Sequence, residues 1–188
     1  MEGVINFIMR YHDLCLENAE KYPECADNMK KVAENCKNIA ERPVQNFHEA
    51  NQAIWFLFVI LQMESNASSF SPGRMDTFMY PYFKKDIDNG VMTEQDALEI
   101  TECLWLKFNE IVYMRNSNSA KFFAGFPIGF NIAVGGQDEN GEPFENELSY
   151  IYLKAQEHIG LPQPNLSVRL CEKTSDKLLK EAIKVVSL

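Results

Sequence analysis

Apolar residues near the start of the chain recur at every third or fourth position, which is the spacing of helices that bury one face. The spacing runs from Val4 to Cys15, resumes at Cys25 and continues to Ile39. Pro23 lies between the two runs, and proline disrupts the interior of a helix. We therefore predict two amphipathic helices in this region.

A third helix is predicted over residues 47–63, and nearly every position from 54 to 60 is apolar. A helix that is apolar on all faces is expected to be buried on all sides. Asn46 followed by Glu49 has the form of a capping box, in which each side chain binds the backbone N–H of the other residue. The helix is therefore predicted to start directly after Asn46.

Turn-forming and capping residues divide the next part of the chain. Pro72-Gly73 follows a polar stretch and predicts a turn, and Thr93 with Asp96 predicts the start of a helix. Four elements are predicted here: a turn over 64–73, a short helix over 77–88, a helix from 93 to about 114, and a loop over 115–124.

Two later segments have the pattern of strands. Residues 128–134 are mostly apolar and end at Gly135-Gly136, and residues 165–170 alternate apolar with polar side chains. Helices are predicted after each strand, over 146–158 and 174–188. The order strand, helix, strand, helix predicts an α/β fold with neighbouring parallel strands, in which the helix 146–158 packs outside as a right-handed crossover.

Two parallel strands alone leave unpaired edges and an uncovered apolar face. The sequence also stops inside an amphipathic helix, with no glycine cap or polar tail. We therefore interpret residues 1–188 as a single partial domain and expect the chain to be a fragment. About 1–125 form a helical shell, and 126–188 form the strands with their crossover helices.

Composition and charge argue against several classes of protein. The chain is 46% hydrophobic and 12% aromatic, which is typical of a globular protein. Its net charge of −9 argues against a nucleic-acid partner, because such binding needs clustered Lys and Arg. The longest apolar run, residues 53–61, is far shorter than the roughly 20 residues of a membrane-spanning helix, and no signal peptide is recognisable. We predict a protein without nucleic-acid or membrane partners.

Cysteine and histidine positions argue against disulfides and metal. The five cysteines are odd in number and widely spaced, which fits reduced thiols in the cytoplasm, and we predict them to be small core residues. His12, His48 and His158 make no metal-ligand spacing with a cysteine or a carboxylate, so no metal site is predicted. The cysteines are Cys15, Cys25, Cys36, Cys103 and Cys171.

Three polar motifs are candidates for function, and each has a structural alternative. The run 64–69 follows an apolar helix, so its polar groups either line a buried site or cap the helix. Arg74 could bind a substrate carboxylate, or it could form an internal ion pair with Asp76 or with a neighbouring carboxylate. Residues 138–141 lack the bidentate Glu of a calcium loop, and we predict a turn.

Eight motifs stand in order between about residue 39 and the end: FHEA at 47–50, ESN at 64–66, SPGRMD at 71–76, YPY at 80–82, CLWLK at 103–107, NIAVGGQ at 131–137, NELSY at 146–150 and PQPNLSVR at 162–169. Together they resemble the glycyl radical enzymes, the pyruvate formate-lyase-like family. The glycerol and diol dehydratase branch is the most similar subgroup.

The resemblance implies a fold and a chemistry. The family fold is a ten-stranded α/β barrel wrapped by helices, and this mostly helical chain would carry its first strands. In the family, an activating enzyme that uses S-adenosylmethionine and an iron–sulfur cluster installs a glycyl radical. That radical oxidises a cysteine to a thiyl, which abstracts hydrogen from the substrate in anaerobic metabolism.

Neither the family's Gly-Cys-(Val/Ile)-Glu-like loop nor its Arg-Val-(Ala/Ser)-Gly-Tyr-like loop occurs in the 188 residues. We therefore expect no catalytic residue and no bound cofactor in this chain, which should be inactive by itself. The implied partners are a small organic substrate, the activating enzyme and, for the full-length protein, a second copy in a homodimer.

The resemblance also implies three substrate-binding positions. Ser69 matches the serine that hydrogen-bonds the substrate hydroxyl in the glycerol dehydratases. Ser68 stands where they carry a histidine, and Phe126 stands where they carry a tyrosine. These departures remove hydrogen-bonding groups and favour a substrate less polar than a small triol, or one with other functional groups. The subgroup stays open among dehydratase, decarboxylase and formate-lyase-like members.

A second hypothesis is a non-catalytic protein that kept the helical shell for interaction or dimerisation. The reading frame beyond Leu188 distinguishes the two hypotheses. Cysteine and glycyl loops downstream would support the enzyme, and a stop codon would support the interaction protein.

Overall fold

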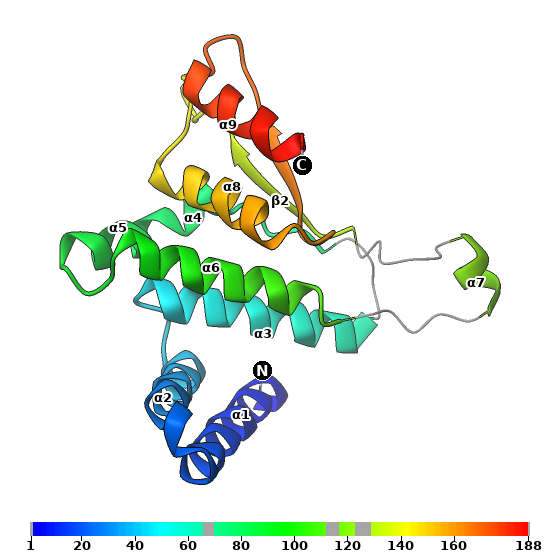
Figure 1. The fold of residues 1–188 in the computed structure, drawn as a ribbon. Helices are drawn as coiled ribbons and strands as arrows, with labels where there is room; N and C mark the ends of the chain where they lie inside the picture. The colour runs from blue at the N-terminus through cyan, green and yellow to red at the C-terminus, as the bar shows by residue number, and fades with distance from the viewer. Residues whose placement is uncertain (1, 66–69, 112–116, 123–128, 188) are drawn as a thin grey trace.

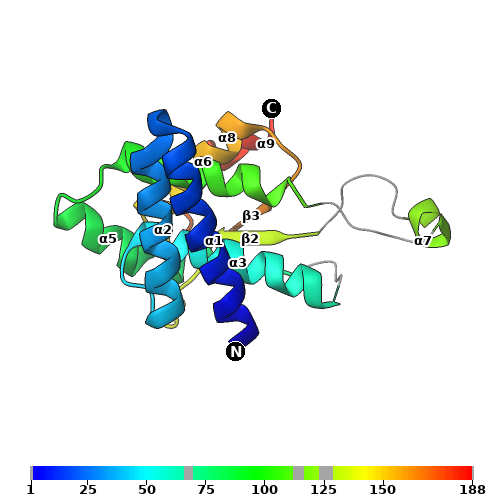
Figure 2. The same cartoon turned by 90° about the horizontal axis from the view of Figure 1, so that it is seen from below.

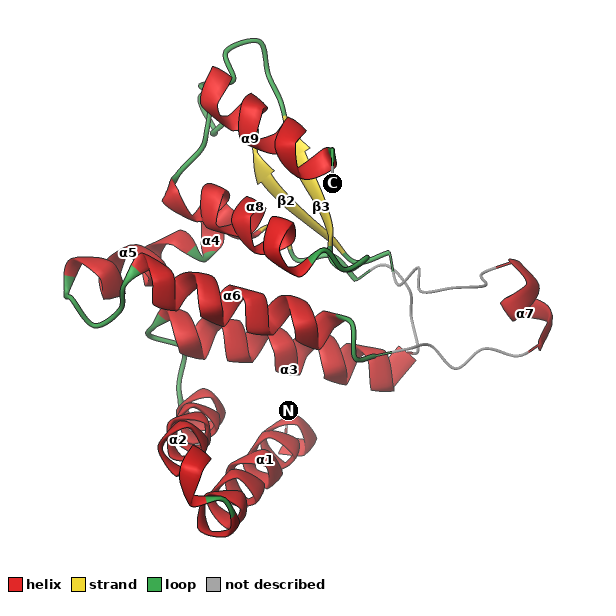
Figure 3. Ribbon diagram, viewed as in Figure 1, coloured by secondary structure: helices red, strands yellow, loops and turns green. Residues whose placement is uncertain are grey.

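The structure, a computed structural model, describes residues 2–65, 70–111, 117–122 and 129–187. Helices predominate, and a small sheet lies toward the end of the chain (Figures 1 and 3). The elements are α1 (Glu2–Lys21), the 3₁₀ helix η1 (Pro23–Cys25), α2 (Ala26–Glu41), α3 (Phe47–Ser65), β1 (Gly73–Arg74), α4 (Met75–Phe78), α5 (Tyr80–Asp88), α6 (Glu94–Phe108), α7 (Ser117–Phe122), β2 (Asn131–Gly135), α8 (Glu147–Ile159), β3 (Asn165–Arg169) and α9 (Asp176–Val186).

The helices are stacked in layers. Helices α1 and α2, which the sequence spacing predicted, form a hairpin, and Figure 2 shows this hairpin running across α3. Helices α3 and α6 lie side by side in the middle of the molecule, and α8 packs between α6 and the sheet (Figure 1). Helix α9 packs on α8.

The sheet is parallel, with the strand order β1-β2-β3. Strands β2 and β3 pair in register from Asn131 opposite Asn165 to Gly135 opposite Arg169. The prediction of neighbouring parallel strands joined through a helix is therefore confirmed. Pro72-Gly73 was predicted as part of a turn, but Gly73 begins a third strand that pairs with Ile132 of β2. A two-residue strand has no periodicity, so only the pairing reveals it.

Aromatic side chains fill the main core. Phe58 of α3 and Phe108 of α6 meet Phe130, which directly precedes β2, at ring-centroid distances of 4.7 and 4.4 Å. Trp105 of α6 lies 5.2 Å from Tyr152 of α8, and both side chains are completely buried. The core therefore joins α3, α6 and α8 to the start of the sheet. A smaller cluster around Ile8, Cys36 and Phe56 joins the hairpin to α3.

Burial differs from the sequence prediction in two places. Helix α3 is not buried on all sides, because Leu57 and Met63 are 54% and 60% exposed. Among the described elements, its contacts are with the α1–α2 hairpin, α5, α6 and Phe130 at the start of β2. Among the cysteines only Cys36 is buried, whereas Cys25 and Cys103 are exposed and the other two, Cys15 and Cys171, are partly buried. All five thiols are free.

Three element boundaries also differ. The helix predicted over 77–88 is divided into α4 and α5, and α7 occupies part of the predicted loop 115–124. Helix α6 was predicted to reach about residue 114 but ends at Phe108. Asn109 ends it by donating its side-chain N–H groups to the carbonyls of Trp105 and, from a distant part of the chain, Gln163. The described helices include none that is long and apolar enough to cross a lipid bilayer.

Candidate functional site

Hydrogen bonds tie the amino ends of the strands to one another. The backbone N–H of Asn131 donates to Ser71 Oγ at 3.1 Å, which joins the start of β2 to the residues before β1. The N–H of Phe130 donates to Gln163 Oε1 at 3.3 Å, and the N–H of Asn165 donates to the Phe130 carbonyl at 2.9 Å. The chain therefore enters all three strands at one connected point.

The end of α6 is fastened to the same point. Asn109 Nδ2 donates to the Gln163 carbonyl at 2.6 Å, and the Gln163 N–H returns a bond to Asn109 Oδ1 at 3.2 Å. Gln163 is only 3% exposed. These amides hold the helical layer against the sheet at its amino edge.

The three substrate-binding residues predicted by resemblance lie outside the described residues. Ser68 and Ser69 fall in 66–69, and Phe126 falls in 123–128. Most of the polar run 64–69, which could instead cap the helix, also lies outside the described residues. The range 66–69 ends shortly before Ser71, and the range 123–128 ends shortly before Asn131. Ser71 and Asn131 are hydrogen-bonded to each other. The structure thus shows that the two segments rejoin the described chain at neighbouring points.

A buried carboxylate lies at the opposite, carboxyl edge of the sheet. Asp76 is completely buried at the start of α4, directly after β1. Its Oδ2 accepts from the Gly135 N–H at 2.7 Å and from Ser149 Oγ at 2.7 Å. The Asn146 side chain donates to the Asp76 carbonyl at 2.8 Å. Asp76 therefore links β1 to the end of β2 and to the start of α8.

Burial governs the protonation of this cluster. Burial raises the pKa of Asp76, although the hydrogen bonds from Gly135 and Ser149 and the charge of Arg74 act in the opposite direction. Burial also raises the pKa of Tyr152 well above its ordinary value, and the negative charge of Asp76 adds to the effect. The cluster holds a carboxylate on neutral donors and joins three elements, which indicates a structural role.

Arg74 turns away from Asp76 and toward the loop after β2. The predicted ion pair with Asp76 is wrong, since Arg74 Nη1 donates to the Gln137 carbonyl at 2.8 Å and no salt bridge joins the two residues. The Arg74 guanidinium lies 4.9 Å from the Phe144 ring centre. Arg74 thus reaches the loop after β2, whereas Asp76 points inward, and Arg74 acts on Asp76 only through its charge.

The turn predicted at 138–141 is confirmed. Asp138 Oδ1 accepts from the N–H groups of Asn140 and Glu142, and the Gly141 N–H donates to the Asp138 carbonyl. In the described part of the chain, no three His, Cys, Asp or Glu side chains are grouped so that they could hold a metal ion.

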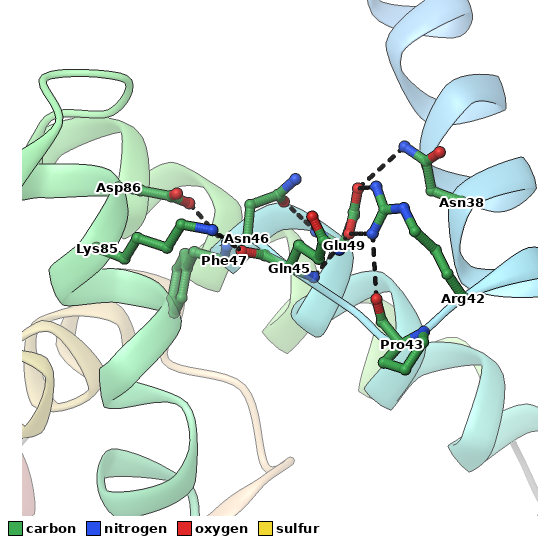
Figure 4. Close-up of polar contacts among 9 residues, drawn as sticks. All are labelled: Asn38, Arg42, Pro43, Gln45, Asn46, Phe47, Glu49, Lys85 and Asp86. Carbon is green, nitrogen blue, oxygen red and sulfur yellow. Dashed lines mark hydrogen bonds and ion pairs between the residues drawn. The ribbon is translucent and has the colours of Figure 1, made fainter.

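A second buried carboxylate lies at the junction of α2 and α3 (Figure 4). Glu49 is 1% exposed, and its carboxylate accepts two hydrogen bonds from the Arg42 guanidinium at 2.8 and 2.9 Å. Asn38 Nδ2 and the Gln45 N–H also donate to it. The predicted capping box is half formed, because Asn46 caps the Glu49 N–H while the Glu49 carboxylate binds Arg42 instead of Asn46.

The junction is also fastened to α5. Asp86 Oδ2 accepts from the N–H of Phe47, and Lys85 Nζ donates to the Gln45 carbonyl (Figure 4). The start of α3 is therefore held from two sides. This arrangement explains the FHEA motif at 47–50 as a structural motif.

One polar residue that sequence reasoning missed is Gln62, on the apolar helix α3. It is 7% exposed, and neither its Nε2 nor its Oε1 has a hydrogen-bond partner. A glutamine inside a run of apolar residues was the available signal. It was overlooked because the segment 47–63 was considered only as a buried apolar helix.

Comparison with known proteins gives the family. The family model for pyruvate formate lyase-like proteins (PFL-like) matches residues 1–188. The chain is 38% identical over 190 residues to the "Probable dehydratase YbiW" of Escherichia coli strain K12, and the match covers 98% of this chain and 24% of that protein.

Two solved structures are similar over nearly the whole chain. A protein described for 1,2-propanediol dehydration in Roseburia inulinivorans has a TM-score of 0.94 at 39% identity, covering 98% of this chain and 22% of its own. A glycyl radical enzyme from Archaeoglobus fulgidus has a TM-score of 0.93 at 34% identity, covering 99% and 24%. The chain thus spans about a quarter of the length of the relatives that it matches.

Proposed function

Because the chain belongs to the pyruvate formate lyase-like family of glycyl radical enzymes, we propose that it forms part of a lyase that abstracts hydrogen from a small organic substrate. It contributes a helical shell over about 1–125, which also holds β1, and further parallel strands of an α/β barrel over 126–188. A dehydratase is favoured, because proteins similar to this chain are named or described for dehydration.

One observation carries this proposal. The parallel strands β1, β2 and β3 and the helices around them superpose on a glycyl radical enzyme with a TM-score of 0.93 at 34% identity. Agreement at this level extends to the strand order and the helical layers. A non-catalytic protein that kept only a helical surface for interaction would not require the paired strands of the barrel, so their presence favours the enzyme.

The radical-bearing groups belong to another part of the enzyme. A glycyl radical, installed by an S-adenosylmethionine-dependent activating enzyme, supplies the hydrogen-abstraction chemistry. This chain holds neither family loop that carries the radical, so its residues position the substrate and support the barrel. We place the complete enzyme in the cytoplasm as a homodimer, and the five free thiols agree with a reducing compartment.

Substrate positioning is assigned to the segments before β1 and β2. Ser69 hydrogen-bonds a substrate hydroxyl, and Ser68 and Phe126 shape the same pocket. The hydrogen bond between Asn131 and Ser71 supports this assignment, because it brings together the points at which the two segments rejoin the chain. Phe126 makes an apolar wall where the dehydratases have a tyrosine.

The reading frame downstream of Leu188 is the first test, with cysteine and glycyl loops expected there. The complete enzyme, treated with its activating enzyme and S-adenosylmethionine, should show a glycyl radical by electron paramagnetic resonance and should dehydrate 1,2-propanediol. The 188-residue chain alone should show no radical and no turnover. A stop codon after Leu188, or a radical on the short chain, would contradict the proposal.

Ser69→Ala in the complete enzyme tests the pocket. Loss of one substrate hydrogen bond should lower turnover roughly tenfold and leave the melting temperature nearly unchanged. Unchanged turnover with a melting temperature lowered by several degrees would instead support the helix-capping alternative.

A further inference from the structure

Gln62 has an unusual environment among the described side chains. Both polar atoms of its amide are buried without a partner, although leaving a buried donor or acceptor unpaired is unfavourable. No other described side chain has its complete amide in this condition. A group outside the described structure is therefore needed to pair with it.

Its position on α3 is defined by its neighbours. Gln62 follows Phe58 by four residues and Trp55 by seven, so the three side chains lie on one face of the helix. Phe58 packs on Phe130 at the start of β2, 4.7 Å between ring centres. Gln62 lies one turn beyond Phe58, about 6 Å further along the helix. Figure 3 shows the end of α3 on the same side of the molecule as the amino ends of β2 and β3.

Three other amides, on α3 and at the amino edge of the sheet, each have a hydrogen-bond partner within the chain. Asn109 and Gln163 bind each other, and Gln163 also accepts from Phe130. Asn51, eleven residues before Gln62 and on the same face of α3, donates its N–H to the Phe47 carbonyl, and only its oxygen is unpaired. Each of these three amides has at least one backbone partner, whereas Gln62 has none.

We propose that Gln62 is a substrate-binding residue that recognises a hydroxyl group, an inference that rests on the proposed lyase function. An amide offers a donor and an acceptor side by side, and a hydroxyl both donates and accepts, so one hydroxyl can satisfy both atoms. A carboxylate or a sulfonate only accepts and would leave Oε1 unpaired. The site therefore selects an alcohol group on the substrate, whatever other groups the substrate carries.

The test compares Gln62→Met with Asn51→Ala in the complete, activated enzyme, with 1,2-propanediol as the probe. Methionine has nearly the volume of glutamine but cannot pair with a hydroxyl. We expect Gln62→Met to lower kcat/KM at least tenfold while its melting temperature stays equal or rises, because an unpaired polar group is removed. Asn51→Ala should lower the melting temperature and leave kcat/KM within about twofold of the wild type.

A crystal structure of the same enzyme with 1,2-propanediol gives a second measurement. A substrate hydroxyl within hydrogen-bond distance of Gln62 supports the proposal. A protein group or a water molecule alone on the Gln62 amide overturns it, as does an unchanged kcat/KM for Gln62→Met in an active enzyme. If the wild-type enzyme shows no radical after treatment with the activating enzyme, the proposed function itself is contradicted. If the wild type is active and Gln62→Met has the same kcat/KM, only the role of Gln62 is contradicted.

Discussion

Two buried carboxylates, Glu49 and Asp76, show how the same functional group is accommodated in opposite ways. Glu49 is 1% exposed and Asp76 is completely buried, so both have lost most of their contact with water. Burial raises the pKa of Glu49, but the hydrogen bonds and charge of Arg42, with Gln45 and Asn38, outweigh it and leave the pKa lowered. For Asp76 burial prevails and the pKa is raised.

The charged partner accounts for part of this difference, and the deeper enclosure of Asp76 by protein atoms accounts for the rest. Arg42 places a full positive charge on Glu49 through two parallel hydrogen bonds, the strongest arrangement for a carboxylate. Asp76 is held by an amide N–H and a hydroxyl, and Arg74 contributes charge only from further away. The α2–α3 junction should therefore depend on charge, whereas the sheet edge should depend on hydrogen-bond geometry.

The largest effect is expected from removing the charge at the junction. Arg42→Met leaves Glu49 buried without its cation, and breaking a buried ion pair costs about 3–5 kcal/mol. Because Arg42 is itself one-third exposed, we expect a loss near the lower limit, about 3 kcal/mol, in urea unfolding of the 188-residue chain. Arg10→Met, on the exposed side of α1, is the control and should change stability by less than about 0.5 kcal/mol. Similar losses in both variants would refute the ranking.

A matched pair of amide substitutions should separate the two carboxylates. All partners of the Glu49 carboxylate are donors, so Glu49→Gln turns an N–H group toward other N–H groups, and we expect a loss of about 2 kcal/mol.

In Asp76→Asn the two short bonds can remain on one oxygen, because Gly135 and Ser149 both donate to Oδ2. Thr77 Oγ1, 3.4 Å from the other oxygen, can accept from the new amide. The expected loss is below about 1 kcal/mol. Equal losses for the two amide variants, by chemical denaturation, would show that burial matters more than the partner.

The smallest effect is expected in the pH dependence, which should have opposite signs. The lowered pKa of Glu49 adds stability above its unfolded-state pKa, and this is lost as pH falls through the folded-state value. The raised pKa of Asp76 means that the folded state holds the proton more tightly, so its contribution is full at low pH and is lost as pH rises through the folded-state value.

Denaturation curves between about pH 6 and pH 3 measure both signs. On acidification the stability advantage of the wild type over Glu49→Gln should shrink, and its advantage over Asp76→Asn should grow. Parallel curves for the two variants would mean that the carboxylates titrate alike.

Much of the fold was predictable because helix and strand periodicity is a local property. Helices α1, α2 and α8 were predicted from spacing and the parallel pair β2–β3 from the order of strands and helices, and the segments found agree to within a few residues. The candidate site was predictable only by resemblance, through Ser68, Ser69 and Phe126, and these positions stay predictions because they lie outside the described residues. Gln62 was missed because periodicity identifies which face is buried, and not which buried polar group lacks a partner.

The sequence by itself determined most of the helices and the turn at 138–141, because residues a few positions apart control these elements. The alternation of strands and helices determined that β2 and β3 are parallel. Only the tertiary structure decided which donors meet Glu49 and Asp76, that Gly73 starts a strand, and that Gln62 is left unpaired. Those outcomes depend on groups that the fold brings together from distant parts of the chain. The free-energy cost of desolvating a buried polar group depends on where that group lies. The hydrogen bonds and charges that offset this cost come from neighbours that no local sequence pattern identifies.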